Sequence, residues 1–211
     1  EDAAWNPILA RPLADIAVEL GLSLDAAGAH LDSAHARLYA EREKRVRPGR
    51  DEKQLTSWNA LMIAGLARAG SVMRRPDWVR EAQQALDALC VHVWRDGRLF
   101  ASYQRGEARL NAYLDDHAFL LDALLASLAA CWRPRDLDWA REVADALLTH
   151  FEDPEHGGFF FTSHDHEALI ARQKPAYDHA TPSGNGVAAF ALQRLGRLYG
   201  EPRYEAAAGR A

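Results

Sequence analysis

Three short stretches of the sequence combine carboxylates with imidazole and aromatic side chains. They are Asp51-Glu52-Lys53-Gln54-Leu55-Thr56-Ser57-Trp58-Asn59, Tyr113-Leu114-Asp115-Asp116-His117 and Tyr177-Asp178-His179-Ala180-Thr181-Pro182-Ser183-Gly184-Asn185. Two carboxyl groups, or a carboxyl group with an imidazole, can transfer protons as general acid and base. Aromatic faces beside carboxylates also suit sugars, because the C–H face of a sugar stacks on the ring while its hydroxyls bond to the acids. The residue types therefore indicate acid–base chemistry on a sugar or a similar polyol.

We assign roles to the candidates within these stretches. Asp116 and Asp178 are the candidate catalytic acid and base. The candidate substrate-binding residues are Asp51, Lys53, Trp58, Asn59, Asp115, His117, Tyr177, Ser183 and Asn185. An inverting glycosidase would need its two carboxyl groups on opposite sides of the scissile bond, which is a property of the fold and not of the sequence.

Helix capping is the competing explanation for the same residues. Ser57, Asp115 or Asp116, and Ser183 are good N-caps, because their side-chain oxygens accept hydrogen bonds from free backbone N–H groups. For any single residue, capping is favoured over catalysis, and Asp51 with Lys53 could form a structural ion pair. Capping does not explain the additional polar and aromatic residues that are repeated in each stretch.

Two alternating kinds of helix must position these stretches. Three predicted helices are apolar nearly all round, which indicates cover on most sides; they span Trp58–Ala69, Ala118–Ala130 and Val187–Leu198. Amphipathic helices follow them over Asp77–Trp94, over Asp138–Phe151 and from about Pro202, and two helices precede them over Leu13–Leu20 and from Ser23 to about Arg45. A simple bundle would give every helix one wet face. The alternation predicts an all-α fold, a partial (α/α) toroid of inner and outer helix pairs.

A repeated pattern between the pairs predicts short β-hairpins. In the first copy, Gly97-Arg98-Leu99-Phe100 is followed by a polar turn and Leu110. In the second copy, Gly158-Phe159-Phe160-Phe161 is followed by a polar turn and Leu169-Ile170. Each copy links an amphipathic helix to the next apolar helix and ends in an acid.

Parallel inner helices would bring the three stretches to one end of the molecule. A helix N-terminus offers free backbone N–H groups and the positive end of the helix dipole, which suit polar and anionic ligands. We therefore expect Asp51, Asp116 and Asp178 to face one polar depression. His164-Asp165-His166 has the residue types of a metal site, but its place in a turn favours an exposed polar turn, so neither a metal nor another cofactor is predicted.

Composition places the chain among ordinary globular proteins. It has 211 residues, of which 26% are charged, and a formal net charge of −5. Basic residues are mixed with acidic ones, which argues against nucleic-acid binding, and no apolar run predicts a membrane span. Cys90 and Cys131 lie in apolar helical stretches and are interpreted as buried free thiols, with a disulfide as the alternative. Free thiols favour a reducing compartment, so a cytoplasmic protein is predicted.

At the same motifs the chain resembles the C-terminal region of the YyaL/spermatogenesis-associated family, whose members have an N-terminal thioredoxin-like domain. The likeness lies in Asp51-Glu52-Lys53 with Ser57-Trp58-Asn59, in Leu114-Asp115-Asp116-His117-Ala118-Phe119, and in Gly157-Gly158-Phe159-Phe160 with Asp178, Ala180 and Pro182-Ser183-Gly184-Asn185. Family members often have Tyr where this chain has His117. The resemblance implies a six-hairpin, glycosidase-like toroid, similar in fold to N-acylglucosamine 2-epimerases. It also implies that residues 1–211 are a fragment of one toroid domain.

The leading functional hypothesis is a carbohydrate-active or carbohydrate-binding domain, glycosidase-like or sugar-epimerase-like, acting by acid–base chemistry. Lys53 and Asn185 would position the sugar-like ligand, while Trp58 and Tyr177 would stack on it. The alternative is a non-catalytic scaffold or binding module for the thioredoxin-like domain of the same full-length protein. An open arc of three helix pairs would also expose apolar flanks, so the fragment is predicted to self-associate or to be less stable than the full-length protein.

Overall fold

The computed structural model describes residues 8–167 and 169–211 of the chain. The chain divides into two compact units, Glu1–Asp51 and Glu52–Ala211. That both units belong to one toroid domain stays a prediction. Within the described residues, no helix combines the length and the apolar character needed to span a membrane.

The first unit contains a pair of helices, α1 (Leu13–Glu19) and α2 (Leu24–Arg42), which contact each other. Ser23 caps α2, because its Oγ accepts a hydrogen bond from the backbone N–H of Ala26 at 3.2 Å. Of the residues in these two helices, Ala17 and Ala27 are the buried ones. The helix pair therefore has little core of its own.

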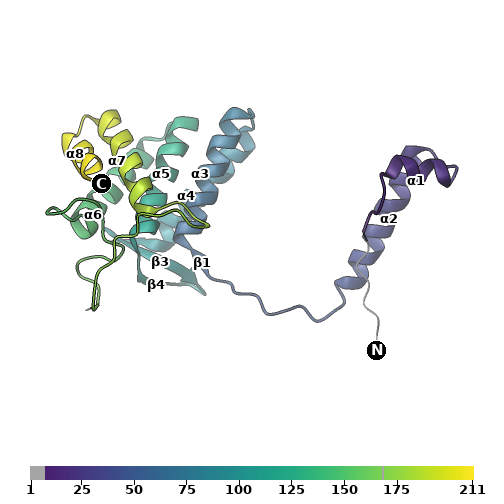
Figure 1. Cartoon of the computed structure of the whole chain (residues 1–211), viewed down its shortest axis with the longest axis horizontal. Coiled ribbons are helices and arrows are strands. Elements are labelled where there is room, and N and C mark those ends of the chain that lie inside the picture. The colour runs from purple at the N-terminus through teal and green to yellow at the C-terminus, as the bar shows by residue number, and fades with distance from the viewer. Residues whose placement is uncertain (1–7, 168) are drawn as a thin grey trace. The chain divides into compact units, whose positions relative to one another are not determined.

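The second unit has the predicted alternation of inner and outer helices. The inner helices are α3 (Thr56–Val72), α5 (Leu114–Ala130) and α7 (Gly184–Tyr199), and the outer helices are α4 (Pro76–Val93), α6 (Pro134–Phe151) and α8 (Pro202–Arg210). Helix α5 packs against both α3 and α7, while α4, α6 and α8 pack against α3, α5 and α7 in turn. Figure 1 shows α3, α5 and α7 side by side, with their N-terminal ends toward the β-strands. This arrangement is an arc of an α/α toroid, as the sequence predicts.

Burial explains why the two kinds of helix differ in sequence. On α5 nearly every side chain from Leu114 to Leu128 is buried, because helices α3, α6 and α7 pack around it. On α4 and α6 one apolar stripe is buried and the opposite side is polar. Each outer helix begins with a proline, whose missing N–H breaks no helical hydrogen bond at that position.

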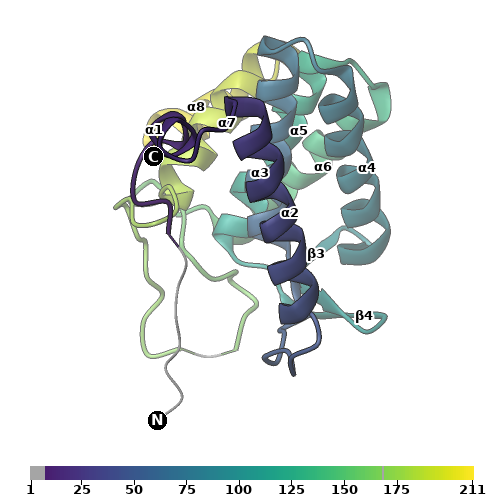
Figure 2. The ribbon, with the colours of Figure 1, turned by 90° about the vertical axis from the view of Figure 1, so that its right-hand side faces the viewer.

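A small antiparallel sheet lies at the N-terminal ends of the inner helices. Its strands are β1 (Gln54–Leu55), β2 (Trp94–Arg95), β3 (Arg98–Gln104) and β4 (Glu107–Asn111). Strands β1, β2 and β4 each pair with β3. Strands β3 and β4 form the first predicted hairpin, whose turn residues Arg105 and Gly106 both have positive φ, as a tight hairpin turn requires. Figure 2 shows this hairpin at one end of the helices.

The second predicted hairpin does not form. In residues 152–167 and 169–183, which we call the linker segment, the described β pairing is a single bridge between Glu152 and Phe159. The reason lies in Asn185 of α7, which occupies both backbone groups of Phe159. The Phe159 N–H donates to Asn185 Oδ1 at 2.7 Å, and Asn185 Nδ2 donates to the Phe159 carbonyl at 2.9 Å. These backbone groups are the ones through which a hairpin partner would pair.

The two cysteines are free, as predicted, but their predicted burial is wrong. Both Cys90 and Cys131 are exposed. Cys90 lies off the buried stripe of α4, and Cys131 follows the last turn of α5, where the surrounding helices no longer cover the chain.

Apolar side chains are exposed on the two inner helices at the flanks of the arc. Trp58 and Met62 of α3 are 66% and 64% exposed, and Phe190 of α7 is 56% exposed. Self-association of the isolated chain therefore stays our prediction. Light scattering checks it: a dimer or larger species is expected, and a monodisperse monomer at high concentration would contradict it.

Candidate functional site at three helix N-termini

The N-termini of α3, α5 and α7 meet through two acidic side chains of α5. Asp116 Oδ1 accepts a hydrogen bond from the backbone N–H of Ser57, in the first turn of α3, at 2.9 Å. Asp115 lies so close to Gly184, the first residue of α7, that a methyl group on Gly184 would overlap the Asp115 carboxylate. The structure therefore brings together the three helix starts at which the sequence places the candidate site residues.

Asp116 caps two helices at once. Its Oδ2 accepts the backbone N–H of Tyr113, the N-cap of α5, at 2.9 Å, while its Oδ1 holds Ser57. The residue is 4% exposed. Burial raises the pKa of its carboxyl group to about 6, against the effect of the two backbone hydrogen bonds, which favour the charged form. Helix α3 has no acidic residue in its own first turn. Asp116 of α5 supplies the carboxylate at its N-terminus instead.

Asp115, the preceding residue, faces α7 rather than α3. Successive residues of a helix point about 100° apart, so two consecutive acids on α5 must face different neighbours. Asp115 is partly exposed, and its partial burial raises the pKa of its carboxyl group. The sequence pattern predicts that both acids lie in a loop before the helix. They lie instead inside its first turn, because Tyr113 is the N-cap.

Asp178 caps the start of α7 from the linker segment. Its Oδ1 accepts the backbone N–H of Ser183 at 2.8 Å, and the residue is exposed. Ser183 is the N-cap of α7, since its Oγ accepts the N–H of Gly186 at 3.4 Å. Asp178 and Asp115 therefore both lie beside the first residues of α7, one from the linker segment and one from α5.

Two amide side chains among the candidates hold backbone groups in the structure. Asn185 is 8% exposed, and its Nδ2 donates to the carbonyl of Pro175 at 3.0 Å in addition to its bonds with Phe159. Asn59 Nδ2 donates to the carbonyl of Leu55 at 2.8 Å, at the junction of β1 and α3. These hydrogen bonds attach β1 to the start of α3 and the linker segment, which contains Asp178, to the start of α7.

His117 faces away from the Asp115 side of α5. Its Nδ1 lies 3.0 Å from the carbonyl of Tyr113, and its ring packs on Phe151 with ring centroids 4.8 Å apart. Burial lowers the pKa of His117 to about 4. The ring thus lines a chamber between α5, α6 and the sheet.

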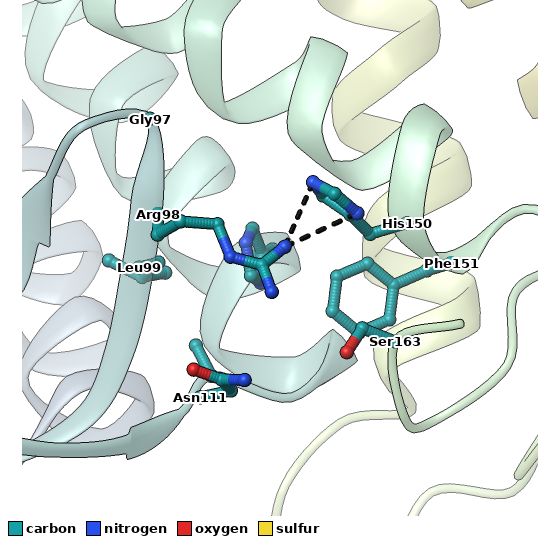
Figure 3. A pocket seen from close by; sticks show the side chains of 9 residues that line it. Gly97, Arg98, Leu99, Asn111, His150, Phe151 and Ser163 are labelled. Atoms are coloured by element: carbon teal, nitrogen blue, oxygen red, sulfur yellow. Dashed lines mark hydrogen bonds between the residues drawn. The ribbon is translucent and has the colours of Figure 1, made fainter. Parts of the chain in front are cut away.

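Arg98 lies at the centre of this chamber (Figure 3). Its Nη1 lies 3.0 Å from His150 Nε2, and its Nη2 pairs with Asp165 of the linker segment. The chamber has about 10 Å³ of free space, room for about one water molecule. Sequence reasoning missed this cluster because His150 and Asp165 are 52 and 67 residues from Arg98. The available signal was Arg98 itself, which lies in the first copy of the repeated pattern, at the start of β3.

Two candidate aromatic residues are exposed near the helix starts, and their stacking on a ligand stays a prediction. Trp58 is 66% exposed and Tyr177 is 78% exposed. Lys53 precedes β1 and is exposed. Asp51 belongs to the first unit. Its predicted convergence with Asp116 and Asp178 stays a prediction.

An arc of parallel inner helices backed by antiparallel outer helices defines the α/α-toroid class, and solved structures share this fold. The cellobiose 2-epimerase from Bacillus thermoamylovorans matches with a TM-score of 0.64 and 12% identity, over 78% of this chain and 44% of that protein. An α-1,6-mannanase from a Salegentibacter species matches with a TM-score of 0.57 and 18% identity, over 73% of this chain and 44% of the mannanase. At these identities the likeness shows the fold.

The sequence points to particular relatives within this class. Human spermatogenesis-associated protein 20 is 30% identical over 190 residues, which are 85% of this chain and 24% of the human protein. The resemblance to the spermatogenesis-associated family is thereby confirmed: the chain is a relative of these proteins and spans about a quarter of their length. No family model matches the chain.

Proposed function

We propose that this domain binds carbohydrates at the N-termini of α3, α5 and α7 and acts on them by acid–base chemistry. The observation that carries the proposal is the placement of two reachable carboxylates beside one helix start. Asp178 holds the backbone of Ser183, and Asp115 lies against Gly184, the next residue. Two carboxyl groups in such a position can serve as acid and base, and a helix N-terminus supplies backbone N–H groups for hydroxyl or carboxylate oxygens.

In this proposal Asp115 replaces Asp116 as the partner of Asp178. Both oxygens of Asp116 accept backbone N–H groups, and the residue is almost fully buried. A ligand would have to separate α3 from α5 to reach it. Asp116 therefore acts as a positioning residue, which fixes the first turn of α5 and with it the direction of Asp115.

The aromatic residues support a sugar rather than a small anion as the ligand. Trp58 and Tyr177 expose large ring faces close in sequence to the helix starts. Exposed aromatic rings are costly to leave in water, and a ring with a polar edge is suited to a ligand that has an apolar face and hydroxyl groups.

The structural neighbours support the same substrate class. The Salegentibacter mannanase is an inactive variant in which two consecutive aspartates are replaced by asparagine, and it is bound to α-1,6-mannotriose. This chain also has two consecutive aspartates, Asp115 and Asp116, at the start of an inner helix. The other neighbour is an epimerase of the disaccharide cellobiose.

A non-catalytic binding module is the second candidate. The observation that favours it is the complete engagement of Asp116 and Asn185 with backbone groups, which leaves fewer side chains for chemistry. Such a module would support a thioredoxin-like domain elsewhere in the full-length protein. A cytoplasmic location would suit that partner.

Calorimetric titration and product analysis with α-1,6-mannotriose, cellobiose and mannose test the proposal. Asp115→Asn and Asp178→Asn should lose turnover by about 100-fold or more while binding is retained. Asp138→Asn, which changes an exposed acid on α6, is the matched control and should behave as the wild type.

The aromatic contribution has its own matched pair. Trp58→Ala should weaken binding by about 3- to 10-fold. Trp132→Ala removes a ring that is 53% exposed beyond the C-terminus of α5, so binding should not change. Binding without turnover, unchanged by the Asp115 and Asp178 substitutions, would favour the non-catalytic module. No binding at all would refute the carbohydrate proposal.

A further inference from the structure

A surface depression lies beside the N-cap of α5, outside the group of acids. Its lining consists of Leu110, Asn111, Tyr113, His166 and Glu167, and it encloses about 260 Å³. That volume is slightly below the roughly 300 Å³ at which pockets for drug-sized ligands begin. The depression is therefore of a size for one sugar ring or a group of similar bulk.

Leu110 has a backbone conformation that strand residues avoid. The register pairs Phe100 with Asn111 and Ser102 with Arg109, yet Leu110, between them on β4, has a φ of +62°. A branched L-residue in the left-handed region is strained, because its Cβ crowds the backbone. The Leu110 side chain is nevertheless 65% exposed, so burial of an apolar side chain does not compensate for the strain. Strained residues that the fold maintains are often found at binding sites.

The remaining lining residues offer hydrogen bonds around a fixed aromatic ring. Tyr113 stacks on Phe161 with ring centroids 5.1 Å apart, and His166 lies tilted against Tyr113 at 5.9 Å. The Nδ1 atom of His166 is buried and makes no hydrogen bond to the described residues. Asn111 and Glu167 are exposed at the rim. Together the residues provide an amide, a carboxylate and an imidazole, which can bond to neighbouring hydroxyl groups.

We propose that this depression is a second subsite, which holds one additional ring of an oligosaccharide whose reacting end lies at Asp115 and Asp178. The inference rests on the proposed function, because it extends the same ligand. Tyr113, two residues before Asp115, connects the two sites along the chain. The subsite would make binding depend on the length of the oligosaccharide, while a monosaccharide would occupy the acid-lined site alone.

The test compares α-1,6-mannotriose with mannose by calorimetric titration of the full chain. Leu110→Gly removes the apolar wall and relieves the left-handed backbone, so the melting temperature should stay the same or rise. The same change should weaken mannotriose binding by about 5- to 10-fold and leave mannose binding unchanged. His166→Ala and Asn111→Ala should show the same dependence on ligand length.

Arg105→Gly is the matched control, because Arg105 also has a left-handed φ, +52°, but lies at the hairpin turn and not in the depression. It should also keep or raise the melting temperature, and it should bind both sugars as the wild type does. If the wild type binds mannotriose and the three subsite variants do so equally well, the subsite is refuted and the proposed function stands. If the wild type binds neither sugar, both are refuted.

Discussion

Helices α5 and α7 each begin beside an aspartate that accepts backbone N–H groups, but the two aspartates differ in exposure. Asp116 accepts the N–H groups of Ser57 and Tyr113, and Asp178 accepts that of Ser183. Asp116 is buried between two helices, whereas Asp178 is exposed on the linker segment. Hydrogen bonding to a helix start is therefore common to both acids, and exposure is what distinguishes them. Only the exposed carboxylate can also contact a ligand.

Removal of the buried acid should have the largest effect on stability. Asp116→Ala leaves the backbone N–H groups of Ser57 and Tyr113 without their charged acceptor, and each such bond contributes about 1.5–3 kcal/mol. We expect the free energy of unfolding to fall by about 3–5 kcal/mol in urea denaturation. Asp178→Ala should cost about 1 kcal/mol, as the loss of an exposed cap does.

Asp138→Ala is the control for both, with an expected change near zero for an exposed acid on α6. Equal losses for Asp116→Ala and Asp178→Ala would contradict the division of roles between the two helix starts.

The pH dependence of stability should reveal the buried Asp116 and His117, because the pKa shifts of these two residues change stability in opposite directions. The pKa of Asp116 rises from 3.8 to about 6 on folding, so the stability it contributes is present below pH 3.8 and is lost as the pH rises to 6. The pKa of His117 falls from 6.5 to about 4, so its contribution is present above pH 6.5 and is lost as the pH falls to 4. In the wild type the two effects largely cancel.

Single substitutions should separate them. In His117→Phe, stability should decrease by about 1–3 kcal/mol as the pH rises from 4 to 6, because His117 no longer offsets the Asp116 effect. In Asp116→Asn, stability should instead increase over the same range. Urea denaturation at a series of pH values measures both, and parallel profiles for the two variants would contradict the assignment.

The contact between α5 and α7 can be tested with one methyl group. Gly184→Ala should lower stability by about 1–2 kcal/mol, because the methyl overlaps the Asp115 carboxylate and crowds Leu114. Gly65→Ala is the matched control on α3, where nothing lies within 4 Å of the new Cβ. There the helix propensity of alanine should raise stability by about 0.5–1 kcal/mol. A gain in both variants would show that Asp115 does not lie against α7.

Periodic apolar residues made most of the fold predictable. The buried α5 and the one-sided α4 and α6 differ in a pattern that can be read along the chain, since burial on all sides demands apolar residues at every turn. The prediction of a second hairpin was wrong because Asn185 binds Phe159, 26 residues away, and no local sequence pattern reveals such a contact.

The candidate site was predictable only as a region. The sequence marks acids near each helix start, but whether Asp115 or Asp116 faces the surface depends on which neighbour each one meets. Likewise, the exposure of Cys90 depends on which side of α4 is left uncovered. These properties arise from tertiary packing, and they decide which of several chemically similar residues is available.

The most direct test of the central claim is an NMR titration of the ¹⁵N-labelled chain with α-1,6-mannotriose. The indole N–H of Trp58 lies at the N-terminal end of the inner helices, and that of Trp132 lies at their C-terminal end. We expect saturable shifts of the Trp58 indole and of the Asp115 and Gly184 amides, with the Trp132 indole unchanged. Shifts confined to the Trp132 end, or none at millimolar sugar, would contradict a carbohydrate site at the three helix N-termini.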